Sequence, residues 1–248
     1  MDWKKILDDL EAGIIRAAEP SGDTWKANIE VKEAILAAFR EGKNAEYSGI
    51  YEGFVDKNNI PPRMFSVNQG VRMVPGGSSV RRGAYVAKGV IIMPPAYVNI
   101  GAYVDEGAMI DSHALVGSCA QIGKNVHLSA GVQIGGVLEP VGLSPVVIED
   151  DCFVGAGAVI VEGILVKRRA VIAPGVTLSK SVPVYDCVNE TILGKGVAIP
   201  EGAVVVPGTR PAGSEWASKM GLNMYCPLIV KYRDEDSDAS LELENALR

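Results

Sequence analysis

Histidine and cysteine, the residues that most often hold zinc, are scarce in this chain. Two histidines occur among 248 residues, and four cysteines lie 33 to 39 residues apart without a Cys-x-x-Cys pair. This spacing suggests neither a zinc site nor a disulfide framework, so we expect no bound metal. The cysteines are expected to be buried free thiols of a cytoplasmic protein; they are Cys119, Cys152, Cys187 and Cys226.

The chain also has no excess of positive charge. The chain has 24 lysines and arginines against 30 aspartates and glutamates, a net charge of −6. A nucleic-acid surface needs a basic stripe, so we expect no nucleic-acid partner. No apolar run approaches the ~20 residues of a membrane span, and the N-terminal MDWKKILDDLEAG lacks the apolar stretch of a signal peptide. We therefore expect a cytoplasmic location and no membrane partner.

The chain does have an aliphatic residue at every sixth position from residue 74 onward. The first set has eleven members without a miss, a second set of seven starts in a new phase at residue 148, and a third has three. Repeats of this kind decide the fold before any other signal. The members are Val74, Val80, Val86, Ile92, Val98, Val104, Ile110, Val116, Ile122, Leu128 and Ile134; then Ile148, Val154, Ile160, Val166, Ile172, Leu178 and Val184; then Leu193, Ile199 and Val205.

A six-residue period predicts a solenoid in which a short strand and a sharp corner alternate three times per coil. The aliphatic side chain points inward and stacks on its equivalents, and about seven coils are expected. Glycine suits the corners because it has no Cβ. The register breaks at 136–147 and 185–192 predict loops that leave the prism. Glycines three positions after an inward residue are Gly83, Gly89, Gly101, Gly107, Gly175, Gly202 and Gly208.

The flanking segments predict caps for the open ends of the solenoid, which would otherwise invite strand addition. Residues 2–18 and 24–41 show helical apolar spacing, with Asp23 before the second helix and Gly42 after it. We expect a helical N-terminal domain and connector over 1–70, a β-helix over 71–210, and a C-terminal cap and tail over 211–248. Within the last segment, Met224 to Tyr232 is expected to be a strand and residues 233–248 a short helix or frayed tail.

Three long motifs narrow the class of protein. They are YVNIGAYVDEGAMID (97–111), VGSCAQIGKNVHLSAGVQIGGVLEP (116–140) and VIEDDCFVGAG (147–157). These motifs resemble the tetrahydrodipicolinate N-succinyltransferase family of the hexapeptide-repeat acyltransferases. The likeness extends from about residue 32 to 232, and the N-terminal region is shorter than in the family. The resemblance implies left-handed coiling, a mainly β chain and an enzyme of lysine and diaminopimelate synthesis.

The resemblance also implies the partners of the protein. Members of the superfamily are typically trimers that bind acyl-CoA in the groove between neighbouring subunits. We expect succinyl-CoA as a co-substrate, an amine acceptor as the second substrate, and no permanently bound cofactor. The loop at 136–147, IGGVLEPVGLSP, is the expected cover of the acyl-CoA groove.

Joining an amine to a thioester requires a base, donors for the developing oxyanion and cations for substrate carboxylates. By resemblance, Asp111 matches the acidic residue of the family's active site, and Arg72 matches an arginine near the acceptor carboxylate. Ser118 aligns with a substrate-binding segment, and Gly135 and Gly136 align with a CoA-binding one. Each also has a structural interpretation: a corner carboxylate, a surface arginine, a corner serine or glycine.

The two histidines are interpreted differently. Superfamily members often use histidine as a general base, but this family assigns that role to carboxylates, so His127 is expected to be structural. His113 stands where the family commonly has tryptophan. It lies two positions after Asp111, and we weigh a substrate-binding role or an Asp–His pair for it.

The sequence GAGAVIVEG (155–163) departs from the family pattern GARSEVVEG. Gly157 and Val159 replace an arginine and an active-site glutamate, which predicts a changed acceptor site; Gly157 remains a candidate for CoA contact. Lys167, with the adjacent Arg168 and Arg169, and Lys219 are candidates for binding CoA phosphates. A solvated basic surface is the structural alternative for them.

Three alternatives remain beside the N-succinyltransferase. One is a paralogue in a specialised pathway, such as tabtoxin synthesis, with another acceptor or with acetyl-CoA. A second is a γ-type carbonic anhydrase, which needs three zinc-binding histidines where this chain has two. The third is a catalytically impaired β-helix scaffold, suggested by Gly157 and Val159, which would bind no CoA.

Overall fold

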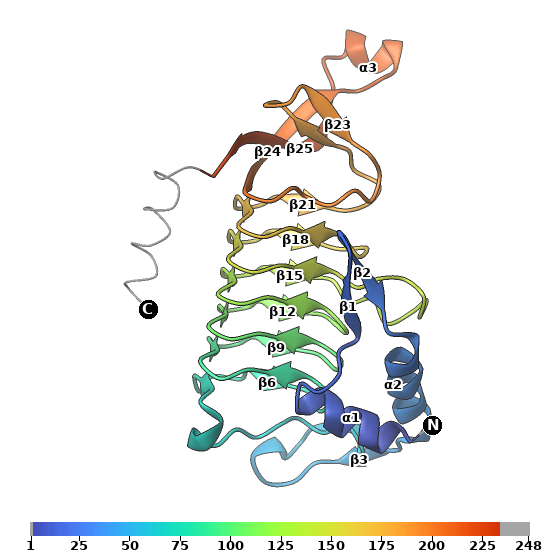
Figure 1. The fold of residues 1–248 in the computed structure, drawn as a ribbon, viewed down its shortest axis with the longest axis vertical. Helices are drawn as coiled ribbons and strands as arrows, with labels where there is room; N and C mark the ends of the chain where they lie inside the picture. The colour runs from blue at the N-terminus through green and yellow to red at the C-terminus, as the bar shows by residue number, and fades with distance from the viewer. Residues whose placement is uncertain (1, 234–248) are drawn as a thin grey trace.

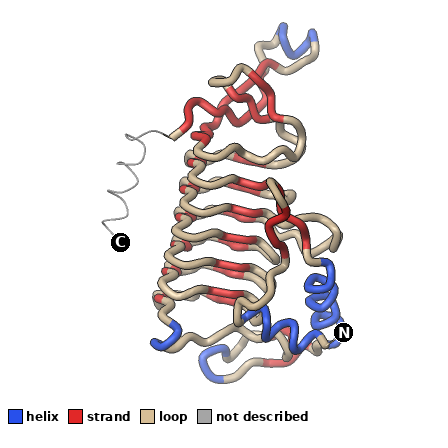
Figure 2. The backbone as a smooth tube through the Cα atoms, in the orientation of Figure 1, coloured by secondary structure: helices blue, strands red, loops and turns tan. Residues whose placement is uncertain are grey.

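A parallel β-helix forms the body of the molecule in the computed structural model, which describes residues 2–233 (Figure 1). Its coils stack along the long axis and its two-residue strands form three flat faces (Figure 2). The predicted tail falls largely on residues 234–248, outside the described residues.

The first face consists of β5 (Arg72–Met73), β8 (Ile91–Ile92), β11 (Met109–Ile110), β14 (His127–Leu128), β17 (Phe153–Val154) and β20 (Val171–Ile172). The second face consists of β6 (Ser79–Val80), β9 (Tyr97–Val98), β12 (Leu115–Val116), β15 (Gln133–Ile134), β18 (Val159–Ile160) and β21 (Thr177–Leu178). The third face consists of β7 (Tyr85–Val86), β10 (Tyr103–Val104), β13 (Gln121–Ile122), β16 (Val147–Ile148) and β19 (Leu165–Val166). We call the corner between the first and second faces corner 1, that between the second and third corner 2, and that between the third and first corner 3.

The predicted inward residues form the core or pack on it, except Val74: the first coil is shifted by one residue, so Met73 pairs with Ile92 in its place. Ile110, Val116 and Leu128 are fully buried, and each pairs in register with the equivalent residue of the next coil. The ladder is parallel throughout the stacked coils, so an inward side chain in the middle of the stack packs on aliphatic neighbours above and below. The expected number of coils is too high: five are complete, because the chain leaves the prism after β21. Ile199 and Val205 then return to it, pairing with Val166 and Ile172.

The N-terminal segment differs from its prediction. The first helix, α1 (Trp3–Glu11), is shorter than expected, and a hairpin of β1 (Ala18–Ser21) and β2 (Thr24–Ala27) follows it. Gly13, whose φ angle is +71°, ends the first helix early. Pro20 and Gly22 lie between the two predicted helices and favour the turn of the hairpin. The second helix, α2 (Ile29–Glu41), is capped by Asn28 rather than by Asp23, and it ends at Gly42 as expected.

These helices pack against the side of the prism and do not cover its end. Leu7 of α1 and Ile35 of α2 share a buried cluster with Ile100 and Cys119 of corner 2. Residues between α2 and β5 close the end instead: the amide of Arg63 donates to the Val80 carbonyl at 2.7 Å, and Phe65 packs on the core. This connector contains β3 (Asn44–Glu46), η1 (Gly49–Tyr51), β4 (Val55–Lys57) and η2 (Val67–Gln69).

The opposite end is closed by β24 (Ala203–Pro211) and β25 (Asn223–Tyr232), with α3 (Glu215–Lys219) between them. The predicted strand in this region is confirmed, and its Ile229 enters the core. The break expected near 185–192 is a hairpin of β22 (Val184–Asp186) and β23 (Thr191–Leu193). No helix among residues 2–233 is long and apolar enough to cross a membrane.

Two expectations about single residue types need correction. Cys187 is exposed, whereas the other three cysteines are buried free thiols. It follows the end of β22 on the hairpin outside the prism, and so it has no core to enter. Gly208 is not a corner residue, because it lies inside β24. The other six predicted corner glycines have positive φ angles, and corners without glycine use residues such as His113 and Asn125.

Gly101 and Gly175 provide a test of corner packing. Both have φ near +70°, but they differ in the space around them. A Cβ added to Gly101 would lie 2.8 Å from Ile35 Cδ1, whereas a Cβ added to Gly175 would have no neighbouring atom within 4 Å. We expect Gly175→Ala to cost about 1 kcal/mol of unfolding free energy and Gly101→Ala about 1–3 kcal/mol more. Urea denaturation measures both. Equal losses would show that α2 does not press on corner 2.

Candidate active site

Asp111 lies at corner 1, where the first face ends. It is half-buried, and one carboxylate oxygen, Oδ1, accepts a hydrogen bond from the Ser112 amide at 2.6 Å. The other oxygen, Oδ2, accepts none from residues 2–233, so it is available to a proton or substrate. The hydrogen bond from the Ser112 amide thus occupies Oδ1 of Asp111, and Oδ2 is left free to accept a proton.

His113 occupies the vertex of the same corner. It is exposed, has a φ of +62°, and its backbone amide donates to the Pro95 carbonyl at 2.6 Å. No hydrogen bond joins its imidazole to Asp111 within the described chain. The left-handed backbone at the vertex breaks the alternation of a strand, which is the reason that spacing by two does not pair these side chains.

The two positions that depart from the family pattern lie at this corner as well. Gly157 is the corner-1 vertex two coils above His113, and Val159 opens the second-face strand that follows it. Coils in a sheet are ~4.8 Å apart, so Gly157 and Asp111 lie about 10 Å apart along the axis. A Cβ on Gly157 would meet no atom within 4 Å. Packing therefore does not require glycine there.

Ser118, Gly135 and Gly136 lie at corner 2, one full face away from Asp111. The Ser118 carbonyl accepts a hydrogen bond from the Val137 amide at 3.1 Å. A Cβ on Gly136 would lie 2.6 Å from the Ser118 nitrogen, so this glycine is required by close backbone packing. The two predicted groups of residues therefore occupy different corners of one prism.

A cavity of about 460 Å³ opens at corner 2 beneath the 136–147 loop. Its polar groups are the Glu139 and Glu162 carboxylates and the Lys180 amine, beside apolar side chains and the backbone of two glycines. Glu162 Oε2 accepts from the Lys180 amide at 2.8 Å. A cationic amine beside exposed glycine backbone suits the carbonyl oxygen of an acyl group. The lining residues are Gly135, Gly136, Val137, Glu139, Leu143, Val161, Glu162 and Lys180.

Lys180 is not among the site residues expected from the sequence, although the repeat contains the signal. In the six-residue register, Lys180 stands at the same corner position as Ser118, Gly136 and Glu162. Counting coils from those candidates would have found it.

The N-terminal domain holds the loop over this cavity. Lys32 of α2 is completely buried, and its Nζ donates to the Leu143 carbonyl at 2.5 Å. Ser144 Oγ donates to the Trp25 carbonyl of the β1–β2 hairpin at 2.8 Å. Burial lowers the pKa of Lys32, and no carboxylate among the described residues pairs with it. A buried cation without an acidic partner costs stability. We therefore infer that Lys32 is retained for its hydrogen bond to the 136–147 loop.

The remaining candidates lie apart from both corners. Arg72 is exposed on the first coil of the first face, and Lys167 is at corner 3. Lys219 is exposed on α3 and pairs with Glu215 at 2.8 Å. His127 is buried on the first face with its ring centroid 5.0 Å from that of Phe153. In a single chain, none of these residues reaches Asp111 or the corner-2 cavity.

Two family models match the chain. A hexapeptide repeat of succinyl-transferase covers residues 145–180, and the N-terminal region of tetrahydrodipicolinate N-succinyltransferase covers residues 3–40. A solved structure, a putative 2,3,4,5-tetrahydropyridine-2-carboxylate N-succinyltransferase from Campylobacter jejuni, is similar with a TM-score of 0.58 at 19% identity. The match covers 92% of this chain and 62% of that one, and it shows the fold.

Curated relatives are much closer in sequence. The 2,3,4,5-tetrahydropyridine-2,6-dicarboxylate N-succinyltransferase of Ralstonia nicotianae is 45% identical over 98% of this chain and 87% of its own length. The enzyme of the same name from Alkalilimnicola ehrlichii is 46% identical over 99% of this chain and 88% of its own length. That from Idiomarina loihiensis is 42% identical, with 98% and 87% covered.

The fold and the repeat define a hexapeptide-repeat acyltransferase with a left-handed β-helix. Within that class, the chain belongs to the tetrahydropyridine-dicarboxylate N-succinyltransferase family, because its relatives match it at 42–46% identity over nearly its whole length.

The contact between Lys32 and the loop predicts a specific effect of Lys32→Met. We expect a melting temperature at pH 7 no lower than that of the native protein, because a buried, unpaired charge is removed. The loop should exchange its amide hydrogens about tenfold faster, because a charge-assisted hydrogen bond is lost. Hydrogen exchange of residues 137–144 measures this. Glu33→Met, an exposed change on the same helix, is the control; unchanged loop exchange in Lys32→Met would contradict the anchor.

Proposed function

We propose that this protein transfers the succinyl group of succinyl-CoA to the nitrogen of tetrahydropyridine-2,6-dicarboxylate, in the synthesis of diaminopimelate and lysine. The identity of 45% over 98% of the chain to an enzyme named for this reaction carries the proposal. The free carboxylate oxygen at corner 1 and the loop-covered cavity at corner 2 support it. The proposal includes a cytoplasmic location, because the thioester donor is a metabolite of the cell interior.

The chemistry assigns a role to each corner. The ring imine of the acceptor must first take up water to provide an N–H amine. The nitrogen then attacks the thioester carbonyl, a C–N bond forms, the C–S bond breaks, and CoA leaves as its thiol. Asp111 accepts the amine proton through its free oxygen, and that proton is finally balanced by protonation of the departing thiolate. Donors at corner 2 stabilise the oxyanion and the acyl-CoA.

Because the two groups of residues occupy different corners of one prism, we propose a homotrimer in which corner 1 of one copy faces corner 2 of the next. The outward side chains of the first face support this arrangement. Four of its six outward residues, Ile91, Met109, Phe153 and Val171, are apolar. The other two are Arg72 on the first coil and His127, whose ring contacts that of Phe153. A solvated sheet surface would be polar at such positions. Covering this apolar ladder with a second copy removes it from water.

Gly157 and Val159 favour one alternative, a paralogue with a changed acceptor or acyl group. Neither side chain can bind a carboxylate or transfer a proton, so corner 1 is less polar here than the family pattern implies. Turnover assays with succinyl-CoA and acetyl-CoA against a panel of cyclic and linear amino-acid acceptors separate the two functions. Activity on another amine, with none on tetrahydropyridine-2,6-dicarboxylate, would favour the paralogue. Absence of CoA binding would favour a scaffold.

Asp111→Asn tests the base. We expect kcat to fall by about 10²–10⁴ with little change in melting temperature, because the amide oxygen can still accept the Ser112 hydrogen bond. Steady-state kinetics with the best substrate pair measure this. Asp23→Asn, the same change in the exposed β1–β2 turn, should leave kcat unchanged. A fully active Asp111→Asn enzyme would exclude Asp111 as the base.

Met109→Glu tests the trimer. A carboxylate in the middle of the apolar ladder has to be desolvated on association, which costs several kcal/mol. We therefore expect sedimentation to show a shift from trimer to monomer, with loss of turnover. Val67→Glu, at a position that is 95% exposed on η2, is the matched control. A trimer that persists in Met109→Glu would place the interface elsewhere.

A further inference from the structure

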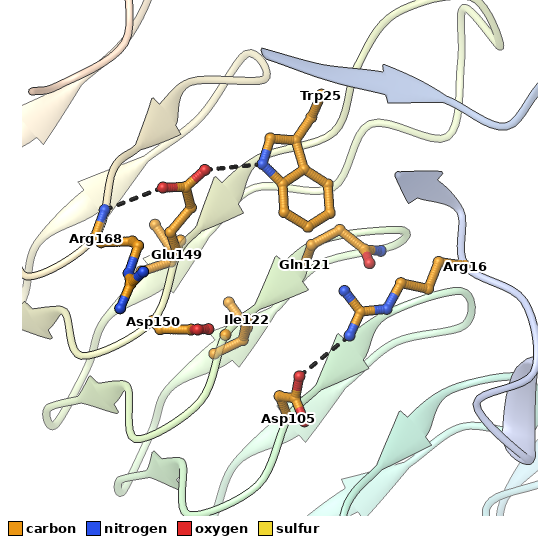
Figure 3. Close-up of a pocket in the computed structure, with 10 residues that line it drawn as sticks. Arg16, Trp25, Asp105, Gln121, Ile122, Glu149, Asp150 and Arg168 are labelled. Carbon is orange, nitrogen blue, oxygen red and sulfur yellow. Dashed lines mark hydrogen bonds and ion pairs between the residues drawn. The ribbon is translucent and has the colours of Figure 1, made fainter. Parts of the chain in front are cut away.

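A second cleft lies between the β1–β2 hairpin and the third face of the prism, near corner 3 (Figure 3). Its volume is about 280 Å³, close to the lower end of the ~300–1,000 Å³ range of small-molecule sites. It shares no lining residue with the cavity at corner 2. Its size suits a small metabolite rather than a coenzyme.

Gln121 provides the first sign that the cleft is built for a ligand. Its side chain is 2% exposed and lies on the cleft wall between Trp25 and Arg16 (Figure 3). The amide nitrogen donates to the Cys119 carbonyl at 2.9 Å, which fixes the orientation of the amide. The amide oxygen is buried and accepts no hydrogen bond from the described part of the chain. A buried acceptor without a donor is costly, so a donor from a ligand would stabilise it.

Arg168 provides a free cation on the opposite side of the cleft. Its backbone amide donates to Glu149 at 3.1 Å, but its guanidinium has no hydrogen bond or ion pair within residues 2–233. Arg16, by contrast, is held in place: it pairs with Asp105 at 3.2 Å and stacks on the Tyr103 ring, 3.4 Å from its centroid. The guanidinium open to an anion is therefore that of Arg168.

Of the carboxylates Glu149 and Asp150, only Asp150 has an oxygen without a hydrogen bond from the described residues. Both oxygens of Glu149 are occupied, by the Trp25 indole N–H at 3.0 Å and by the Arg168 amide. Asp150 uses Oδ1 to accept from the Lys124 amide at 2.8 Å, and Oδ2 accepts nothing from the described residues. The cleft thus offers a guanidinium for an anion and two acceptors, Asp150 Oδ2 and Gln121 Oε1, for a cationic or neutral donor.

We propose that this cleft binds a small zwitterion, an α-amino acid, whose carboxylate pairs with Arg168, whose ammonium group donates to Asp150, and whose side chain carries a donor for the Gln121 oxygen. Open groups of both signs favour a ligand that carries both charges. Three carboxylates against two guanidinium groups repel a phosphate or a simple dicarboxylate. A neutral apolar ligand would leave the Gln121 oxygen without a donor. The inference concerns binding alone and does not depend on the acyl-transfer activity.

Binding is tested with the full-length protein by thermal shift and calorimetry. The proteinogenic L-amino acids are screened one at a time at about 10 mM, which detects millimolar affinity. We expect at least one to raise the melting temperature by about 2 °C or more. The deaminated acid and the decarboxylated amine of that ligand should each bind at least about tenfold more weakly, because each loses one charged contact.

Two variants locate the site. Arg168→Gln and Asp150→Asn should each weaken binding about tenfold or more. The asparagine oxygen of Asp150→Asn can still accept from the Lys124 amide, so folding is preserved. Lys26→Gln is the control: it also removes one positive charge, from the exposed residue next to Trp25 on β2, and affinity should stay within about twofold.

Three results would overturn the proposal: no amino acid binds at about 10 mM, the deaminated acid binds as tightly as the amino acid, or Arg168→Gln binds like the native protein.

Discussion

The stack of inward aliphatic side chains is the constraint on which the rest of this protein depends. Each inward residue is sealed by the equivalent residue of the coil above and the coil below, and the parallel ladder permits this only if register is kept. Most corners turn within a few residues, with positive φ angles at glycine and non-glycine vertices alike. Side chains that differ in type from coil to coil stand at outward positions, at corners and in loops, where the candidate site residues lie.

Register also explains why residues far apart in sequence share a site. One coil is 18 residues, so Gly136, Glu162 and Lys180 align along corner 2 although a loop interrupts the count between coils. Asp111, Gly157 and Val159 align along corner 1 in the same way. A prism cannot bend to bring its corners together. Chemistry that needs both corners therefore requires two copies, which gives the proposed trimer a physical reason beyond its apolar face.

The N-terminal domain adds what the prism cannot provide. Its contacts to the body link α2 to the 136–147 loop through Lys32. They also link Arg16, just before the β1–β2 hairpin, and Trp25 of the hairpin to corner 3. The same hairpin encloses the cleft with Gln121. A repetitive scaffold has flat outer faces, so both described cavities exist because a non-repetitive segment covers them.

The sequence alone determined the β-helix, its inward residues except Val74, its two interruptions and the position of Asp111, because a repeating core requires the same residue type at each equivalent position. The helix limits were wrong at residues 12–18 and 24–28, where the apparent helical spacing continued past Gly13, which ends α1, and into β1 and β2. Only the tertiary structure revealed the side-on packing of α1 and α2, the role of Lys32 and the open oxygen of Gln121. The physical reason is distance along the chain: Lys32 meets the Leu143 carbonyl across 111 residues, and no periodicity encodes a contact that occurs once.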